Sequence, residues 1–350
     1  MQGGRRGGSV GDERVTIVDV ANKAGVAISS VSSALNGRPG VSDVTRERII
    51  RIAAELGFVP SLRGKSLSGR RAFTVGLVLH RDPDVLELDP FFGGFIGGIE
   101  DAIDPRGYAL VLQISAESDK VLQRYEKLAA DRRVDGVFIN DLEVDDPRIA
   151  LVQRLGLPAV AINPGAGFPI PAVREDPDAG IRATLRHLVD LGHRRIAYVS
   201  GRRNMTHSVE RENSWRAGLQ ELGLAPGPVV PGEFTYLGGA SAASVLLESA
   251  DPPTAVMCAN DLSAIGLIAQ AQHLGFDVPG QLSVAGFDDI RLGTYVRPSL
   301  TTVHTSPREL GRQSGRMLVD LIEEGAVDDV RIPDAEMIVR DSTGPARDRR

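Results

Sequence analysis

The sequence predicts two folded parts: an N-terminal all-α domain, and an α/β domain of two lobes, each built on a doubly wound parallel sheet. Residues 16–56 carry apolar side chains at helical spacing in three short stretches, which predicts the first part. From residue 73 onward, apolar runs alternate with amphipathic helices, which is typical of parallel sheets with helical crossovers. The length of 350 residues also exceeds what one core usually covers.

Charge is distributed unevenly along the chain. Residues 1–72 contain 12 Lys and Arg against 6 Asp and Glu, whereas the remainder contains 28 against 40. A basic N-terminal part on an acidic body favours contact with nucleic acid. No apolar run approaches the roughly 20 residues that a membrane span needs, and the first ten residues lack the apolar core of a signal peptide. We therefore expect a cytoplasmic, nucleoid-associated protein with no membrane partner.

Cysteine and histidine usage limits the kinds of site. Cys258 is the only cysteine, so an intrachain disulfide and a cysteine-built zinc site are excluded. Its apolar neighbours 255–257 predict a buried thiol. The six histidines show no H-E-x-x-H or other metal-binding spacing. We expect neither a metal nor a cofactor.

The first helix follows a polar N-terminal segment. Residues 1–14 are rich in Gly and Arg without apolar periodicity, which predicts a disordered basic tail. Thr16 and Asp19 then have the spacing of a capping box. Apolar side chains follow at the spacing of one helix face, at Ile17, Val20, Ala21 and Ala24. These features predict a helix that begins next to Thr16.

Two further helices complete the small domain. A turn at residues 25–27 leads to a helix over 28–36, in which Val31 and Leu35 face inward and serines face outward. The third helix begins at Ser42 and stops at Gly57, with apolar side chains on one face. This pattern is typical of a helix-turn-helix unit, and a small three-helix domain with a solvated serine face explains the periodicity equally well.

A helix-turn-helix unit reads bases with the N-terminal half of its second helix. We therefore expect base contacts from Ile28, Ser29 and Ser33, because hydroxyls bond to several bases and an apolar side chain meets the thymine methyl group. Phosphate contacts position a protein without specifying sequence. They are expected from Thr16, Ser30, Asn36 and Arg38.

The second part contains seven apolar runs of strand length. These runs cover 74–79, 109–114, 136–140, 159–163, 195–200, 255–259 and 282–287. The helical stretches between them include 92–103, 120–130, 181–191, 214–222 and 262–274. So many strand-helix units predict two lobes. Ligands of such sheets bind outside the carboxyl ends of the strands, so we expect a binding crevice between the lobes.

Motifs in a fixed order cover the chain from residue 15 to residue 343. In the first part they are TIVDVA at 16–21, AGV at 24–26, VS at 31–32, LN at 35–36, VS at 41–42, TR at 45–46, Ile49, ELGF at 55–58, Pro60 and KSL at 65–67. In the second they are DPFF at 89–92, RVDG at 133–136, LGH at 191–193, ND at 260–261, GFD at 286–288 and PSLTTV at 298–303. This ordered set resembles the LacI/GalR family of bacterial repressors.

The resemblance implies a division of the chain into domains. A helix-turn-helix domain is expected at 15–59 and a hinge at 60–72. A two-lobed domain like the periplasmic binding proteins, which binds effector and dimerises, is expected at 73–343, with a flexible tail at 344–350.

The family's hinge is a short helix that orders on operator DNA and inserts a leucine pair from the dimer into the minor groove. Leu67 occupies the wedge position, and Lys65 is placed to approach a phosphate. An apolar wedge unstacks a base step and kinks the duplex. A plain polar linker is the alternative interpretation of this segment.

The resemblance also implies seven effector contacts. The polar ones are Asn163, Arg211, Asp261 and Asp288, and the aromatic ones are Phe91, Phe92 and Phe234. Arg211 and Asp288 are expected to form a charged clamp for ligand hydroxyls or ring N–H groups. Aromatic faces pack on sugar or purine rings, although each phenylalanine alone is more commonly a core residue.

Three residues depart from the family pattern in the DNA-binding part. Ala27 stands where a Ser or Thr usually caps the second helix, a loss of about 1 kcal/mol. Ser33 stands where a larger polar residue, frequently Arg, reads a base, so we expect an operator that differs from the common one. Gly64 weakens the hinge helix by up to about 1 kcal/mol.

The resemblance implies a sequence-specific transcriptional regulator, expected to be a repressor. We expect it to bind a palindromic operator as a homodimer or within a tetramer, under allosteric control by a small ligand, a sugar or sugar derivative rather than a purine. Two other classes compete. A periplasmic sugar-binding protein fits the two lobes but not the helices at 16–36. An enzyme would use Asp261, His207 and Asp288, but no Walker A or G-x-G-x-x-G motif follows a strand, so we expect no enzyme.

Overall fold

The computed structural model describes residues 15–35, 37, 39–58, 71–81, 90–165 and 167–347. The chain divides into two compact units, 1–73 and 74–350. The predicted tail at 1–14 and the predicted hinge up to residue 70 lie outside the described residues. Within the described ranges, no helix is both long and apolar enough to cross a membrane.

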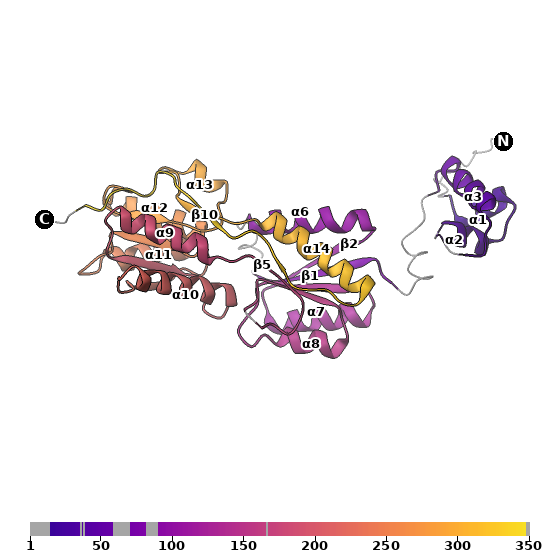
Figure 1. Cartoon of the computed structure of the whole chain (residues 1–350), viewed down its shortest axis with the longest axis horizontal. Coiled ribbons are helices and arrows are strands. Elements are labelled where there is room, and N and C mark those ends of the chain that lie inside the picture. Colours follow the sequence, from indigo (N-terminus) through magenta and orange to yellow (C-terminus); the bar gives the residue numbers. More distant parts are fainter. Residues whose placement is uncertain are drawn as a thin grey trace, which may run out of the picture. The chain divides into compact units, whose positions relative to one another are not determined.

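The first unit contains the three predicted helices. They are α1 (Ile17–Ala24), α2 (Ile28–Leu35) and α3 (Asp43–Glu55), labelled in Figure 1. Their inward faces form one small core around the fully buried Val20, Val31 and Ile49. Leu35 is partly buried against this core. The predicted inward positions are therefore confirmed.

Backbone caps explain where these helices start and stop. The backbone N–H of Thr16 donates to the Asp19 carboxylate at 2.8 Å, which is half of a capping box. α1 ends at Gly25, whose φ of 64° is left-handed and suits glycine. Ser42 caps α3 by accepting from the N–H of Thr45. At α2, the Ala27 carbonyl accepts the first helical hydrogen bonds, and its side chain offers no cap.

The first lobe of the second unit is a six-stranded sheet. Its strands are β1 (Thr74–His80), β2 (Ala109–Ser115), β3 (Gly136–Ile139), β4 (Ala159–Ile162), β5 (Ala172–Arg174) and β11 (Val330–Arg331). The order is β11-β5-β4-β3-β1-β2, and every pair is parallel. Its helices are α6 (Phe91–Ile103), α7 (Ser118–Ala130), α8 (Pro147–Leu155) and α14 (Pro307–Glu324). α6 and α14 cover one face, and α7 and α8 cover the other (Figure 1). A short 3-10 turn, η1 (Asp104–Arg106), follows α6.

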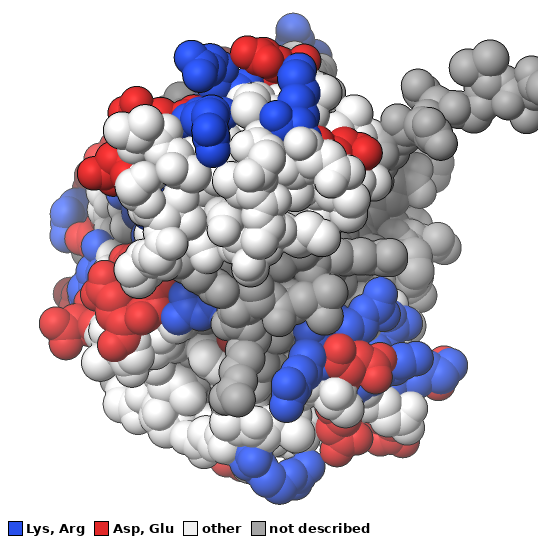
Figure 2. All heavy atoms as spheres, turned by 90° about the vertical axis from the view of Figure 1, so that its right-hand side faces the viewer, with Lys and Arg blue, Asp and Glu red and all other residues white. Residues whose placement is uncertain are grey.

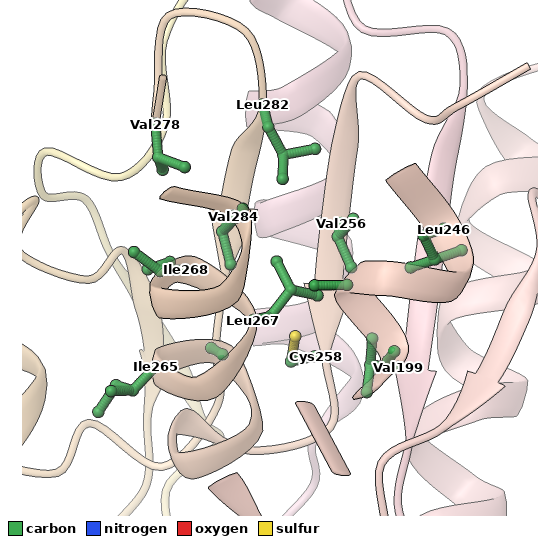
Figure 3. Packing of buried hydrophobic residues seen from close by; sticks show 14 of the residues in the cluster. Val199, Leu246, Val256, Cys258, Ile265, Leu267, Ile268, Val278, Leu282 and Val284 are labelled. Atoms are coloured by element: carbon green, nitrogen blue, oxygen red, sulfur yellow. The ribbon is translucent and has the colours of Figure 1, made fainter. Parts of the chain in front are cut away.

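The second lobe repeats this architecture around four parallel strands. They are β6 (Ile196–Ser200), β7 (Val229–Pro231), β8 (Ala255–Cys258) and β9 (Ser283–Ala285), in the order β7-β6-β8-β9. The surrounding helices are α9 (Asp178–Asp190), α10 (Thr206–Glu221), α11 (Tyr236–Leu247), α12 (Asp261–His273) and the short α13 (Leu292–Tyr295). Figure 3 shows the core between β8, β9 and the helices, in which Cys258 packs among aliphatic side chains. The predicted buried thiol is confirmed.

The chain passes between the lobes three times. The first crossing follows β5 at residues 175–177. An antiparallel pair, β10 (Thr302–His304) and β12 (Glu336–Ile338), belongs to the second and third crossings at 305–306 and 332–335. The lobes also touch away from these crossings, because the N–H of Val144 donates to the Asn204 carbonyl and the N–H of Thr206 donates to the Leu142 carbonyl.

The folded domain extends past residue 343, where the flexible tail was predicted to begin. Gly344 is buried, and its N–H donates to the Ser283 hydroxyl. The N–H of Ala346 donates to the Leu191 carbonyl. The domain was predicted to end at residue 343 because the family motifs end there, whereas the Gly344 carbonyl lies 3.0 Å from His193 Nε2.

Candidate functional site

A pocket lies between the two lobes of the second unit, at the carboxyl ends of the strands. We call it the inner pocket. Its lining residues are Arg81, Phe91, Asn140, Asp141, Ile162, Asn163, His207, Arg211, Phe234, Asn260 and Asp288. Five of the predicted effector contacts are in this set, namely Phe91, Asn163, Arg211, Phe234 and Asp288. Parallel strands from both lobes therefore bring together residues far apart in the sequence.

Arg211 is held in place by three groups of the second lobe. One terminal nitrogen donates to the Ala259 carbonyl at 2.6 Å, and the other lies 3.5 Å from Asp288 Oδ1. The guanidinium also covers the Phe287 ring, 3.7 Å from its centroid, which is a close cation–π contact. The Arg211–Asp288 contact is at the limit of hydrogen-bond length.

Two polar residues of the inner pocket have a positive φ, which is rare for residues other than glycine. Asn163 has φ 47° and Asp288 has φ 112°, and both follow a strand directly or closely. Non-glycine residues adopt such angles rarely, and they concentrate at functional sites. Asn163 Oδ1 accepts from the N–H of Glu175 at 2.8 Å, which ties the loop after β4 to the first crossing.

The first lobe contributes an ion pair that the sequence analysis did not include. Arg81 follows β1 and binds Asp141, which follows β3, through two hydrogen bonds of 2.7 and 2.8 Å. Burial raises the pKa of Asp141, but the Arg81 guanidinium outweighs burial and lowers that pKa to about 2. The pair is therefore fully ionised near neutral pH and adds no net charge to the pocket.

An aromatic pair forms another part of the wall. The rings of His207 and Phe234 stack at 5.2 Å with an angle of 22° between their planes. Burial, and next the nearby Arg211, lower the pKa of His207 to about 3. His207 is therefore neutral at physiological pH, and the pair offers a flat, uncharged surface.

Two asparagines add hydrogen-bonding groups. Asn260 caps α12 by accepting from the N–H of Ser263, and its amide group donates to the Phe234 carbonyl. Asn140 is buried, and its Oδ1 has no hydrogen-bond partner within the described part of the chain. A buried acceptor without a partner is costly, so this oxygen is suited to a ligand donor.

Two predicted effector contacts lie outside the inner pocket. Phe92 is 3% exposed and packs beneath Arg81, because its neighbour Phe91 takes the pocket-facing side of α6. Asp261 is fully buried, where it accepts from the Thr302 hydroxyl at 2.5 Å and from the N–H of Ile290 at 2.8 Å. It joins loops within the second lobe and does not line the inner pocket.

Four polar lining residues were missed in the sequence. They are Arg81, Asn140, Asp141 and Asn260, and His207 was considered only for an enzyme. The signal was present for all four: Arg81, Asp141 and Asn260 follow apolar runs that were predicted to be strands, and Asn140 is the last residue of one. The rule that selected Asp288 at the end of a strand also selects them.

The predicted base-contacting residues lie on accessible parts of α2. Ile28 is 48% exposed, Ser29 is exposed and Ser33 is partly exposed, and the predicted phosphate contact Ser30 is also partly exposed. A large apolar side chain exposed at a helix N-terminus is available to meet a thymine methyl group. Asn36, Arg38, Lys65 and Leu67 lie outside the described residues.

Thr16, a predicted phosphate contact, uses both of its donors within the protein. Its N–H and its hydroxyl each donate to the Asp19 carboxylate, at 2.8 and 2.7 Å. This carboxylate has a lowered pKa because of those bonds, first the side-chain bond from Thr16. A phosphate contact from Thr16 therefore requires one donor to leave Asp19.

The three-helix core itself is electrically balanced. Its basic residues, Lys23, Arg46, Arg48 and Arg51, are matched by Asp19, Asp43, Glu47 and Glu55. Figure 2 shows acidic side chains among the basic ones on the face that it presents. The positive surplus of residues 1–72 therefore comes from the segments that flank this core and from Arg38, which lies between α2 and α3.

Known protein families match both units. The model for bacterial regulatory proteins of the lacI family matches residues 16–61, and that for a periplasmic binding protein-like domain matches residues 185–343. HTH-type transcriptional regulator CelR of Thermobifida fusca is 33% identical over 335 residues, which are 94% of this chain and 98% of that protein. Catabolite control protein A of Priestia megaterium is 31% identical over 90% of this chain and 94% of its own length.

Solved structures share the architecture. A CelR–cellobiose complex matches with a TM-score of 0.73 at 32% identity, over 94% of this chain and all of that one. The lac repressor dimer bound to operator and the anti-inducer ONPF matches with a TM-score of 0.82 at 26% identity, over 95% of this chain and all of that one. These proteins are named as regulators and repressors, not as enzymes, as the sequence predicts. The chain therefore belongs to the LacI family of bacterial DNA-binding transcriptional regulators.

Proposed function

We propose that this regulator is a repressor that binds a palindromic operator as a homodimer, and that a neutral sugar in the inner pocket controls its affinity for DNA. The observation that carries the proposal is the pocket itself. It places the Arg81–Asp141 and Arg211–Asp288 pairs beside an uncharged aromatic surface, between two lobes that ligand can reorient. In this proposal Ile28, Ser29 and Ser33 contact bases of the operator. Arg81 and Asp288 contact the sugar.

The charge balance of the pocket favours a neutral ligand. Each guanidinium faces a carboxylate, and His207 is neutral because its pKa is lowered to about 3. A sugar phosphate would meet no surplus positive charge. Closely spaced amide and carboxylate groups match the dense hydroxyls of a sugar, and stacked rings suit its apolar face.

The relatives support the same ligand class and the same assembly. One similar structure is titled as a complex with cellobiose, and another as a repressor dimer on its operator. Repressors named PurR are also among the relatives, at 30% identity for that of Photobacterium profundum. We favour a sugar because the ionised carboxylates can accept hydrogen bonds from its hydroxyls. Such hydrogen bonds do not require the planar ring of a purine. A purine is the alternative outcome of the ligand screen.

A ligand screen followed by a linkage measurement tests this function. A thermal shift is measured against neutral mono-, di- and trisaccharides, sugar phosphates and purines, because a ligand of the folded state raises the melting temperature. The bound sugar is then titrated with and without an operator isolated by selection from genomic fragments. We expect its affinity to differ by about 5- to 150-fold between the two titrations. Equal affinities would contradict allosteric control, and stabilisation by purines alone would contradict the sugar.

Assembly on DNA is tested with the same operator. Sedimentation of the full chain is expected to give a dimer, and removal of one operator half-site is expected to weaken binding strongly. A monomer that binds a single half-site as tightly as the palindrome would contradict the proposal. Binding should also weaken steeply with salt, because phosphate contacts release counterions.

A further inference from the structure

A second cavity adjoins the inner pocket and is much larger. We call it the outer cavity. Its volume is about 560 Å³, whereas that of the inner pocket is about 60 Å³. Four segments line it: the loop after β4, the crossing around residues 174–178, α10 at Glu210, Asn213 and Ser214, and the region of β11 at Asp329 and Arg331. These segments come from both lobes, so the outer cavity belongs to the same cleft as the inner pocket.

A third space of about 20 Å³, which we call the throat, shares lining residues with both the inner pocket and the outer cavity. Asn163, His207 and Arg211 line both the throat and the inner pocket. Asn163, Glu175 and Glu210 line both the throat and the outer cavity. The three spaces therefore adjoin one another, from the aromatic surface of His207 to the side of α10.

The inner pocket is too small for more than the end of a sugar. A water molecule needs roughly 10–15 Å³ of such space, so about 60 Å³ has room for about five waters, less than one hexose. A ligand with several sugar units must therefore extend beyond the inner pocket towards the outer cavity, and the throat must widen to admit it. The outer cavity offers it far more room than a single sugar uses.

Glu210 is the acceptor best placed for such a ligand. It lines the throat and the outer cavity, and it is partly buried. Within the described residues its carboxylate has no hydrogen-bond or ion-pair partner, whereas Arg174 is bound by Asp329 and Arg331 pairs with Asp176 at 3.5 Å. Burial, and next the nearby Asp176, raise the pKa of Glu210. Hydroxyl donors from a ligand would stabilise the carboxylate that burial disfavours.

We propose that the effector is a neutral oligosaccharide, with the end of its terminal sugar in the inner pocket and its following units in the outer cavity, where Glu210 accepts hydrogen bonds from their hydroxyls. This inference rests on the sugar effector proposed above. It makes Glu210 a specificity residue for chain length. Asn213 and Ser214, one helical turn further along α10, supply neutral hydrogen-bonding groups to the same units.

Affinity as a function of chain length tests the proposal. Calorimetry of the full-length protein is carried out with mono-, di- and trisaccharides of the β-1,4-linked glucose, xylose and mannose series and the α-1,4-linked glucose series. In the series that binds, we expect the trisaccharide to bind at least about tenfold more tightly than the monosaccharide. The Glu210→Gln variant should lower this ratio about tenfold, because a charge-assisted hydrogen bond is lost.

Glu212→Gln is the matched control. Glu212 lies on the same helix and pairs with Arg216 but lines neither cavity, so this variant should keep the wild-type ratio. Melting temperatures without ligand establish that both variants fold. Equal affinities for all chain lengths, or an unchanged affinity ratio in Glu210→Gln, would overturn the oligosaccharide proposal. If a monosaccharide binds in that case, the sugar effector proposed above is retained. Binding of no sugar of any length would overturn both.

Discussion

The Arg81 guanidinium and the Asp141 carboxylate form a two-point ion pair in the wall of the inner pocket. Nε lies 2.7 Å from Oδ2, and Nη2 lies 2.8 Å from Oδ1. The two side chains are only 5% and 8% exposed. A buried pair is held by mutual attraction against desolvation, so removing one partner leaves the other charge uncompensated.

Replacement of Arg81 by Met should therefore destabilise the second unit strongly. We expect the free energy of unfolding in urea at pH 7 to fall by about 3–5 kcal/mol. Adding Asp141→Leu should recover part of this loss, because the stranded charge is removed. Arg106→Met is the control: Arg106 pairs with Asp320 at 2.9 Å and with Glu323 at 2.5 Å, but all three side chains are about a third exposed, so the loss should stay at about 1 kcal/mol or below. Equal losses for the two single variants would contradict a buried ionised pair.

His207 should make the fold sensitive to mild acid. Its pKa is lowered from 6.5 to about 3 in the folded protein, so the unfolded chain binds more protons between these values. Stability is then lost as the pH falls below 6.5. At pH 5 this amounts to at most about 2 kcal/mol. His207→Gln should remove that part of the difference in urea stability between pH 7 and pH 5.

The exposed His273 provides the control for this pH effect. His273→Gln should leave the difference in stability between pH 7 and pH 5 as in the wild type. A His207→Gln variant with the wild-type pH dependence would show that folding does not lower the pKa of this imidazole.

The longer strands were predictable because both of their faces are covered. β1 and β6 are almost fully buried, so they read as continuous apolar runs. β5 and β11 have three and two residues, too few to form a recognisable run. α14 was missed for another reason: its buried stripe contains Gly311, Ser314 and Gly315, small residues that interrupt an apolar pattern.

Those small residues are required by close packing with α6. A Cβ on Gly311 would lie 2.0 Å from the carbonyl oxygen of Phe95, and one on Gly98 would lie 1.9 Å from that of Arg308. Helices can approach this closely only where side chains are absent. Since the partner helix lies some two hundred residues away in the sequence, no local pattern identifies this contact.

The residues of the inner pocket could be predicted where they directly or closely follow a strand that the sequence reveals. Asn163 and Asp288 were selected by position and motif, and both line the inner pocket. Asp261 directly follows the strand-end Asn260 and was selected in the same way, but its first helical turn directs it to Thr302 of β10 instead. Burial that depends on a strand some forty residues away is not visible in a motif.

Asp261 should accordingly matter for stability and not for ligand affinity. Asp261→Ala leaves the buried N–H of Ile290 and the Thr302 hydroxyl without an acceptor, so unfolding in urea should require about 2–5 kcal/mol less. Asp261→Asn keeps one acceptor and should cost less. For the variant that folds, calorimetry should give the wild-type affinity for the bound sugar. A loss of affinity without a loss of stability would return Asp261 to the effector contacts.

The pKa of Asp261 adds a pH dependence with the opposite sign to that of His207. Burial raises this pKa to about 7, so the folded state binds more protons than the unfolded chain between about pH 4 and pH 7. This contribution to stability is present at low pH and is lost as the pH rises towards 7. In Asp261→Asn it should disappear, and stability should then increase with pH more steeply than in the wild type between pH 5 and pH 7.

The second helix of the DNA-binding unit should be improved by a cap. The Ala27 carbonyl already accepts from the N–H of Ser30 at 2.9 Å, so the backbone has the geometry of a helix start without a capping side chain. Ala27→Ser adds an oxygen that accepts from an N–H of the first turn, worth about 1 kcal/mol. Because the chain has two units, amide hydrogen exchange reports on α2 more directly than a global melting curve. We expect exchange of the α2 amides to slow about fivefold. The control is Val18→Ser, at an exposed position inside α1, which should not slow exchange of the α2 amides. Unchanged exchange in Ala27→Ser would show that the N–H groups in the first turn of α2 already have hydrogen-bond partners.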